Sequence, residues 1–275
     1  MDSNHLLAIA EEIKIELLRT CPDILSIIVT GSLAKGRVDA ASDIDIIVYH
    51  KGNIPEEVVQ STHENIIRSG GEIKFSSSEV LIIIKSIEGV KCEIAHLDKK
   101  KAQTVIHRIL QENSTNLQDH TIVTGIHSSR VLYDHYDIMK QWKNELASYP
   151  IALAEALVKD NLTFEPKLIL QQQGLLRQDW AYLAELKLQS ILNLVGVLCG
   201  LNRTYHPGRL KRLDHTLAGL AIQPSHLQES ISHLMTHVDA IHLLEDLIYE
   251  TFDLVDYHMP SVSTSKARVN YEHVW

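Results

Sequence analysis

The stretch "TGSLAKGRVDAASDIDIIVY", residues 30–49, decides how the first part of the chain is interpreted. Gly31 and Gly36 are spaced almost as in a triphosphate-binding loop, whereas Asp43 and Asp45 stand two apart at the start of an apolar run. The stretch is therefore compatible with three structures. It could be a phosphate-binding loop, a pair of metal-binding aspartates, or an ordinary turn between two strands.

The triphosphate loop is the weakest of these interpretations. That motif, G-x-x-x-x-G-K-[ST], places a lysine for the phosphates and a hydroxyl for Mg²⁺ directly after its second glycine. Arg37 and Val38 follow Gly36 in this chain. The hydroxyl ligand is therefore missing and the lysine is replaced, so we set this interpretation aside.

The remaining pattern indicates a single binding site whose residues come from two strands and the turn between them. Residues 24–30 form a β-branched run that predicts a buried strand, and residues 44–49 alternate acids with apolar residues, so Asp43 and Asp45 should share a face. The turn at Gly31 and Ser32 offers backbone N–H groups and a hydroxyl to an anion. Two carboxylates on one face repel each other unless cations lie between them, which favours divalent metals with oxygen ligands. A phosphate cradle facing such a pair is what nucleotidyl transfer requires.

The surrounding sequence predicts an α/β region followed by helices. Helical spacing covers residues 5–19 and 55–68, and two β-rich runs around Glu88 and Gly89 predict a hairpin. From about residue 99 the apolar residues recur at helical spacing. The predicted helical segments are 100–113, 137–147, 180–201 and 226–255. We expect the residues from about 259 onward to form a frayed polar tail.

Composition limits the class of protein. The 275 residues are 45% hydrophobic, and no uninterrupted apolar stretch approaches the roughly 20 residues of a membrane span, so we expect a cytoplasmic protein without a membrane partner. A formal net charge of −9 disfavours nucleic-acid binding and suits small cationic or neutral substrates. Cys21, Cys92 and Cys199 lie far apart without CxxC spacing, which favours buried thiols.

Sixteen histidines raise the question of a second metal site. His233 and His237 stand four apart in a predicted helix, with His226 and His242 nearby. No glutamate accompanies them as in H-E-x-x-H, so ordinary surface histidines explain this pattern.

The combination of motifs resembles a known superfamily. Gly31-Ser32 followed by Ser42-Asp43-Ile44-Asp45 resembles the G-S…D-x-D signature of polymerase-β-like nucleotidyltransferases. With "VKCEIAHLD" at 90–98 and the helical second part, the chain is similar to the small-molecule branch, the aminoglycoside and lincosamide nucleotidyltransferases. The resemblance implies an α+β protein of two domains. Residues 1–115 would form a nucleotidyltransferase domain with a mixed sheet and helices, and 116–275 a helical substrate-binding bundle.

The resemblance also implies roles for residues of the first domain. Asp43, Asp45 and Glu93 would be the catalytic carboxylates and the ligands of two Mg²⁺ ions, with Glu93 deprotonating the acceptor hydroxyl. Glu93 is the only acid within its apolar strand, where a carboxylate is costly unless it serves a metal, a partner or a substrate. The predicted nucleotide-binding residues of this domain are Gly31, Ser32, Lys35, Arg37 and Ser42.

A second resemblance lies in residues 176–213, which look like the second-domain segment of uncharacterised relatives of these enzymes. It implies that Arg209 and Lys211 contact the nucleotide phosphates. Asp179, Tyr182 and Glu185 recur near one helical face and would bind the acceptor.

These inferences predict an enzyme that moves a nucleoside monophosphate to a hydroxyl of a small molecule and releases pyrophosphate. The donor would be ATP or another nucleoside triphosphate, and an aminoglycoside or lincosamide acceptor would make the enzyme an antibiotic-resistance factor. Alternatives are transfer to a protein, as in toxin-neutralising relatives, transfer to an RNA 3′ end, and a regulatory module that binds nucleotide without catalysis. The sequence leaves the acceptor, the nucleobase and the oligomeric state open.

Overall fold

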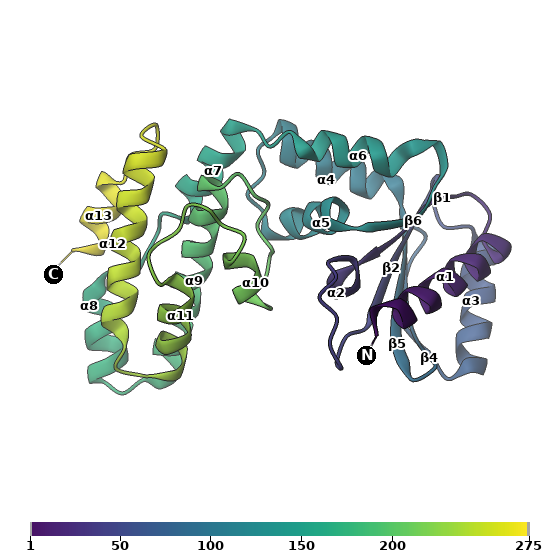
Figure 1. Cartoon of the computed structure of the whole chain (residues 1–275), viewed down its shortest axis with the longest axis horizontal. Coiled ribbons are helices and arrows are strands. Elements are labelled where there is room, and N and C mark those ends of the chain that lie inside the picture. Colours follow the sequence, from purple (N-terminus) through teal and green to yellow (C-terminus); the bar gives the residue numbers. More distant parts are fainter. Residues whose placement is uncertain (1, 274–275) are drawn as a thin grey trace. The chain divides into compact units, whose positions relative to one another are not determined.

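The computed structural model describes residues 2–273 and divides the chain into two compact units (Figure 1). Unit 1 contains the chain up to Arg108 together with Ile122–Ser148. Unit 2 contains Ile109–Thr121 together with the chain from Tyr149 onward. The predicted α+β architecture, a mixed sheet with helices followed by a helical region, is confirmed.

Unit 1 is built on a six-stranded sheet with the strand order β3-β4-β5-β2-β1-β6. Its strands are β1 (Ile24–Thr30), β2 (Ile44–His50), β3 (Glu72–Ser76), β4 (Val80–Ile87), β5 (Val90–Asp98) and β6 (Arg130–Asp134). The central pair β2 and β5 is parallel, and the other neighbouring strands are antiparallel. This mixed sheet brings β2 and β5 together although two strands and a helix separate them in sequence.

Several helices belong to the sheet unit, in whole or in part. The helices that belong wholly to unit 1 are α1 (Ser3–Thr20), α2 (Gly31–Ala34), α3 (Glu56–Ser69), the short 3₁₀ turn η1 (His135–Asp137) and α6 (Ile138–Ala147). Two further helices, α4 (Lys99–Gln111) and α5 (Leu117–Ser128), each have one part in each unit.

We call the face that packs against α1 and α3 the closed face. Alternate strand residues, among them Ile44 and Ile46 of β2 and Cys92 and Ile94 of β5, are buried there with the apolar residues of both helices. The alternation follows from the period of two along a strand. The residues between them, starting with Asp45 and Glu93, lie on the opposite face, which we call the open face. Asp45, Ile47 and Glu93 are half-buried there, whereas Tyr49 further along β2 is buried.

Unit 2 is a bundle around α9 (Trp180–Leu201), which is buried along most of its length. Its other helices are α7 (Ile151–Asn161), α8 (Lys167–Ile169), the π-helix η2 (Leu170–Leu176), α10 (Leu213–Leu217), α11 (Leu227–Thr236), α12 (Ile241–His258) and α13 (Ser265–Tyr271). Gly200 lets α9 approach α7 closely, since a Cβ there would lie 2.6 Å from Cγ2 of Val158. Close contact without a side chain explains the glycine in the last turn of the helix.

The helix α9 is also long and apolar enough to cross a membrane, although Glu185 and Lys187 interrupt it. About two thirds of its most apolar window, 67%, is buried inside the protein. A core helix passes the same test of length and composition, and the burial of α9 identifies it as one.

Most predicted elements agree with the structure, with the following differences. Strands β3 and β6 had not been predicted, and the segment 226–255 is two helices, α11 and α12. The predicted frayed tail was wrong, because α13 packs on the bundle. Tyr271 is fully buried there, and Arg268 donates to Asp253 at 2.7 Å and to Asp256 at 2.8 Å.

The compact units also differ from the predicted division between residues 115 and 116. The strand β6 pairs with β1, and α6 packs beside it, with Tyr49 meeting Trp142 edge-on at 5.1 Å between ring centroids. Residues 122–148 therefore belong to the sheet unit, although they follow residues of unit 2. The three cysteines are free and buried, as predicted.

Candidate active site

The parallel pairing of β2 with β5 sets the geometry of the predicted carboxylates. In its register Asp45 lies directly opposite Glu93, and Ile44 lies opposite Cys92. Asp43 precedes β2 by one residue and is two residues from Asp45, so all three acids belong to the open face. We call Asp43, Asp45 and Glu93 the carboxylate cluster. Sequence periodicity predicted the first two to share a face, and the register adds the third.

Gly31 can lie directly against this cluster because it has no side chain. Its φ of +69° lies in the left-handed region, and a Cβ at this position would come within 2.5 Å of Oδ2 of Asp45. Thr30, directly before it, is paired with Asp45 between β1 and β2. The turn at Gly31 and Ser32 therefore lies against the central carboxylate, and only glycine fits there without strain.

Two lysines, which the sequence analysis had not selected, engage the cluster. Lys91 of β5 donates to Oδ2 of Asp43 at 3.2 Å. Lys74, at an irregularity in the pairing of β3 with β4, donates to Oε2 of Glu93 at 3.1 Å. The hydrogen bond to Asp43, followed by its negative charge, raises the pKa of Lys91.

The sequence could have indicated the position of one of these two lysines and not of the other. Lys91 stands two residues before Glu93, so alternation along the strand could have placed it on the open face. Lys74 belongs to a strand that periodicity did not reveal, and its place depends on the irregular pairing between Ile73 and Phe75. Tertiary structure alone identifies it.

The loop between Gly31 and Asp43 contains the other predicted nucleotide ligands of unit 1. Ser42 shapes the turn, because its hydroxyl donates to Asp39 at 2.9 Å and accepts from the backbone N–H of Asp39 at 2.8 Å. Desolvation, followed by the charge of Arg37, lowers the pKa of Lys35. Arg37 is exposed. Ser42 therefore has a structural function in the loop, and phosphate contacts by these three residues stay predictions.

The carboxylate cluster is chemically suited to Mg²⁺ but does not form a closed metal cage. Among residues 2–273, no three or more His, Cys, Asp or Glu side chains are grouped closely enough to hold a metal ion as they stand. Carboxylate oxygens are the ligands that Mg²⁺ prefers. The three carboxylates are therefore ligands of the right chemical kind for Mg²⁺, and their side chains would have to move closer together to hold one.

The predicted acceptor-binding residues lie at the beginning of α9. Asp179 is the N-cap of this helix, and its side chain accepts from the backbone N–H of Tyr182 at 3.3 Å. Tyr182 is partly buried against the core of unit 2, and Glu185 is exposed one turn further on. Helix capping explains Asp179 without a ligand, so a binding role for this residue is weakened by a structural one.

Arg209 and Lys211 lie in the exposed loop between α9 and α10. The loop is anchored below them, since the backbone N–H of His206 donates to Nδ1 of His120 at 3.1 Å. The N–H of Gly208 donates in turn to Nδ1 of His206 at 2.9 Å. The chain therefore presents both cations from a well-fixed backbone.

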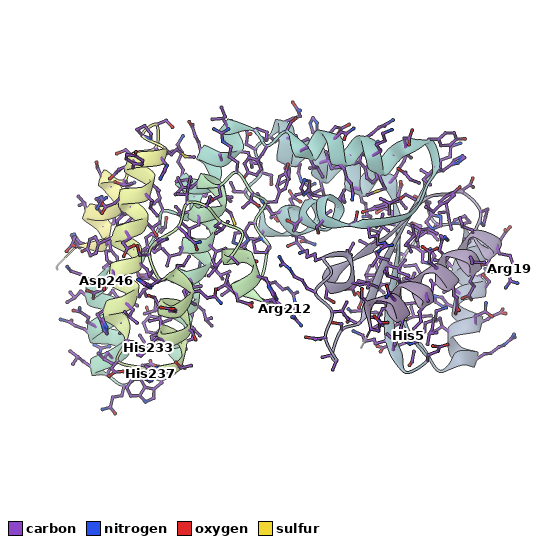
Figure 2. All side chains as sticks on the ribbon, viewed as in Figure 1. His5, Arg19, Arg212, His233, His237 and Asp246 are labelled. Atoms are coloured by element: carbon purple, nitrogen blue, oxygen red, sulfur yellow. The ribbon has the colours of Figure 1, made fainter. Side chains whose placement is uncertain are left out.

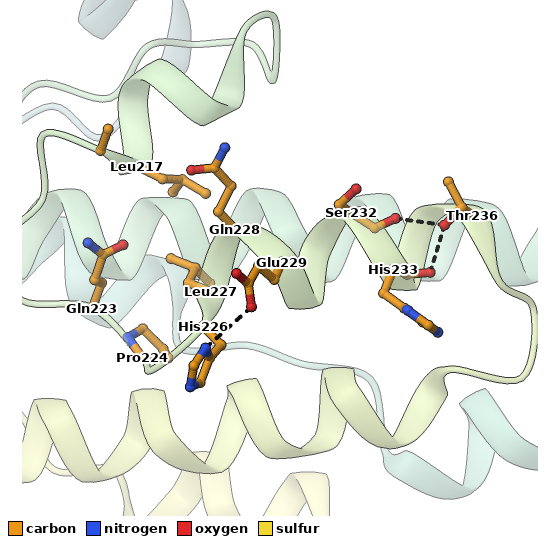
Figure 3. Close-up of a pocket in the computed structure, with 11 residues that line it drawn as sticks. Leu217, Gln223, Pro224, His226, Leu227, Gln228, Glu229, Ser232, His233 and Thr236 are labelled. Atoms are coloured by element: carbon orange, nitrogen blue, oxygen red, sulfur yellow. Dashed lines mark hydrogen bonds and ion pairs between the residues drawn. The ribbon is translucent and has the colours of Figure 1, made fainter.

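The histidines around α11 form no metal site among the described residues. His233 and His237 stack with ring centroids 4.0 Å apart at the end of this helix (Figure 2). His226 and Glu229 form an ion pair at 3.3 Å in an open groove of about 810 Å³, which α11 lines together with Leu217, Gln223 and Pro224 (Figure 3). His226 is exposed, and its ion pair with Glu229 accounts for its position.

Two known families match separate parts of the chain, each over less than half of its length. Residues 10–112 match the family described as nucleotidyltransferase domain. Residues 115–211 match a family described as a domain of unknown function, DUF4037. No curated protein matches the chain.

Solved structures show remote likenesses. A cytoplasmic RNA terminal U-transferase is 21% identical over 46% of this chain and 38% of its own, with a TM-score of 0.29. The Cid1 poly(U) polymerase bound to MgGTP is 18% identical over 46% of this chain and 42% of its own, with a TM-score of 0.29. A nucleotidyltransferase-like protein from Exiguobacterium sibiricum is 12% identical over 92% and 79%, with a TM-score of 0.36. The chain thus spans less than half the length of the two polymerases.

Proposed function

We propose that the protein is a nucleotidyltransferase, because residues 10–112 match the nucleotidyltransferase domain family, and that it transfers AMP from ATP to a hydroxyl of a small molecule. The observation that carries the proposal is the pairing of Asp45 with Glu93 across β2 and β5, with Asp43 on the same face and Gly31 against Asp45. In the reaction the acceptor oxygen bonds to the α-phosphorus and the bond from that phosphorus to the β-phosphate oxygen breaks. Pyrophosphate leaves, and the hydroxyl proton passes to a base.

The residues of unit 1 would divide the work as follows. The backbone and hydroxyl of Gly31 and Ser32 hold the β and γ phosphates, with Lys35, Arg37 and Ser42 contributing from the loop. Glu93 accepts the proton of the attacking hydroxyl, an assistance typically worth ~10²–10⁴ in rate. In the structure Glu93 forms an ion pair with Lys74.

Asp43, Asp45 and Glu93 are the groups that would hold Mg²⁺, as two ions. When bound, Mg²⁺ neutralises charge on the triphosphate and polarises the reacting oxygens. The chain's contribution is to place Asp45 and Glu93 opposite each other on adjacent strands, with Asp43 one residue before the first of them.

Unit 2 would supply the acceptor site. Glu185 is exposed on α9, and Tyr182 beside it could pack against a sugar ring. The formal net charge of −9 supports a cationic acceptor such as an aminoglycoside. A lincosamide is the other class of acceptor that we propose. Asp179 would act mainly as the helix cap. Arg209 and Lys211 would contact the triphosphate, and we expect the enzyme to confer antibiotic resistance in the cytoplasm.

The test is incubation with ATP labelled at the α-phosphate, Mg²⁺ and a panel of aminoglycosides, lincosamides and other polyols, followed by chromatography. We expect label in one acceptor class, and Asp45→Asn should abolish it. An RNA oligonucleotide and a protein extract serve as alternative acceptors. Transfer only to one of these would overturn the small-molecule acceptor, and equal transfer by wild type and Asp45→Asn would overturn the assigned site.

A further inference from the structure

The two lysines of the open face stand where the proposed function requires cations. Lys91 engages Asp43 and Lys74 engages Glu93, the first and the third carboxylate of the cluster. Asp45 stands two residues after Asp43 in the chain and directly opposite Glu93 in the sheet. Its side chain lies against Gly31. Three carboxylates and two ammonium groups leave a formal charge of −1, so most of the repulsion in the cluster is already compensated without a metal.

Both ion pairs are open to solvent. The Lys74 and Lys91 side chains are 54% and 53% exposed, whereas Glu93 and Asp43 are 26% and 31% exposed. An exposed pair of this kind contributes little and exchanges its partner easily. The lysines are therefore suited to a temporary position rather than to a permanent structural bridge.

We propose that Lys74 and Lys91 are exchangeable counter-ions of the carboxylate cluster, which divalent metal displaces and which the triphosphate then receives. The proposal rests on the proposed function, because it takes Asp43, Asp45 and Glu93 as the metal ligands. It makes metal and nucleotide binding cooperative. Two divalent ions alone would raise the local charge from −1 to +3 with the lysines still nearby, whereas a fully ionised triphosphate, at about −4, returns it to about −1.

Lys91 offers the sharper test, since it is fixed by the regular pairing of β5. We expect Lys91→Met, which keeps the aliphatic stem and removes the charge, to bind Mn²⁺ about three- to tenfold more tightly in the absence of nucleotide. The gain in Mn²⁺ affinity on adding α,β-methylene-ATP, which cannot undergo the transfer, should shrink by a similar factor. Both dissociation constants can be measured on the full chain from the electron paramagnetic resonance signal of free Mn²⁺.

Lys101→Met is the matched control. Lys101 is 45% exposed and also forms an ion pair, at 2.7 Å with Glu79, away from the carboxylate cluster. It should leave both Mn²⁺ dissociation constants unchanged. A structural function of Lys91 would lower the unfolding midpoint without tightening Mn²⁺ binding.

The outcomes separate the two proposals. Tighter Mn²⁺ binding by Lys91→Met together with a smaller nucleotide effect supports the exchange. Unchanged or weaker Mn²⁺ binding by this variant, while Asp45→Asn loses Mn²⁺, overturns the exchange and leaves the metal site standing. Wild-type Mn²⁺ affinity in Asp45→Asn overturns the metal site and the exchange together.

Discussion

The two faces of the unit 1 sheet use the same strands for opposite purposes. On the closed face Ile44, Ile46, Cys92 and Ile94 are buried against α1 and α3, at 0–1% exposure. On the open face the residues between them, including Asp45 and Glu93, are half-buried and charged. Around the carboxylate cluster, burial on the closed face stabilises the fold, whereas the open face presents ionised groups whose burial in the core would be costly. Catalysis and stability should therefore be separable by mutating neighbouring residues.

The largest effect should come from the proposed base on the open face. We expect Glu93→Gln to lower turnover by ~10²–10⁴ with triphosphate affinity largely kept, because the amide cannot accept the proton. Turnover is measured by transfer of α-labelled phosphate and affinity by calorimetry. Glu88→Gln, in the turn of the same hairpin, is the control. Unchanged turnover in Glu93→Gln would exclude Glu93 as the base.

One residue away from Asp45, on the closed face, the effect should fall on stability. Ile46 is 1% exposed, and Ile46→Ala should lower the free energy of unfolding by about 2–5 kcal/mol through the cavity left behind. Chemical denaturation measures it. Ile47→Ala, at a half-buried position on the open face, should lower the free energy of unfolding clearly less. If Ile46→Ala and Ile47→Ala lower the free energy of unfolding equally, the two faces do not differ in their contribution to stability.

Low pH should reduce the stability of unit 1 through two buried histidines. His50 and His96 share a hydrogen bond of 2.9 Å inside the protein, and burial lowers the pKa of His50 to about 4 and of His96 to about 3. The unfolded chain takes up protons near pH 6.5 but the folded chain does not. Because the two rings share this hydrogen bond, they titrate as a pair, and stability is lost as the pH falls from about 6.5 toward 4.

Denaturant unfolding between pH 7 and pH 4.5 checks this expectation. A double variant, His50→Leu with His96→Leu, should show a shallower loss over this range, whereas His226→Leu, at an exposed position, should follow wild type. A double variant with the same pH dependence as wild type would assign the acid sensitivity to other groups, including His120 and His206 in unit 2, whose pKa values burial also lowers.

A smaller effect should come from the glycine beside the carboxylate cluster. Gly31→Ala combines a strained φ with a Cβ that would press on Asp45, and we expect about ten- to a hundredfold less transfer. Gly36→Ala is a close control, because Gly36 also has a positive φ, +63°, but nothing lies within 4 Å of its added Cβ. If the two variants lose the same activity, contact with Asp45 is unimportant.

The smallest effect should be that of Lys211→Ala. If the loop of unit 2 contributes to triphosphate binding, removing one exposed cation should weaken the affinity about two- to fivefold. Lys266→Ala, at another exposed lysine of unit 2, should leave it unchanged. An unaltered dissociation constant in Lys211→Ala would assign the triphosphate contacts to the open face of unit 1 alone.

The local elements of the site could be predicted from sequence because their signals are local. The β-branched run at 24–30 and the alternation at 44–49 match β1 and β2 closely, and the helix predicted at 180–201 is α9. The strands β3 and β6 escaped prediction. The residues of β3 are mostly exposed, and β6 is a five-residue edge strand without an apolar alternation. Such strands depend on the partner they pair with.

By itself the sequence determined which side chains could share a face. Period-two alternation makes Asp43 and Asp45 neighbours, and Glu93 stands out as the one acid in an apolar run. Tertiary structure decided that Glu93 lies opposite Asp45, that Lys74 and Lys91 engage the cluster, and that α13 is packed rather than frayed. The reason is physical. Periodicity follows from the backbone of one strand, whereas the register between β2 and β5 depends on how the intervening helix and strands pack.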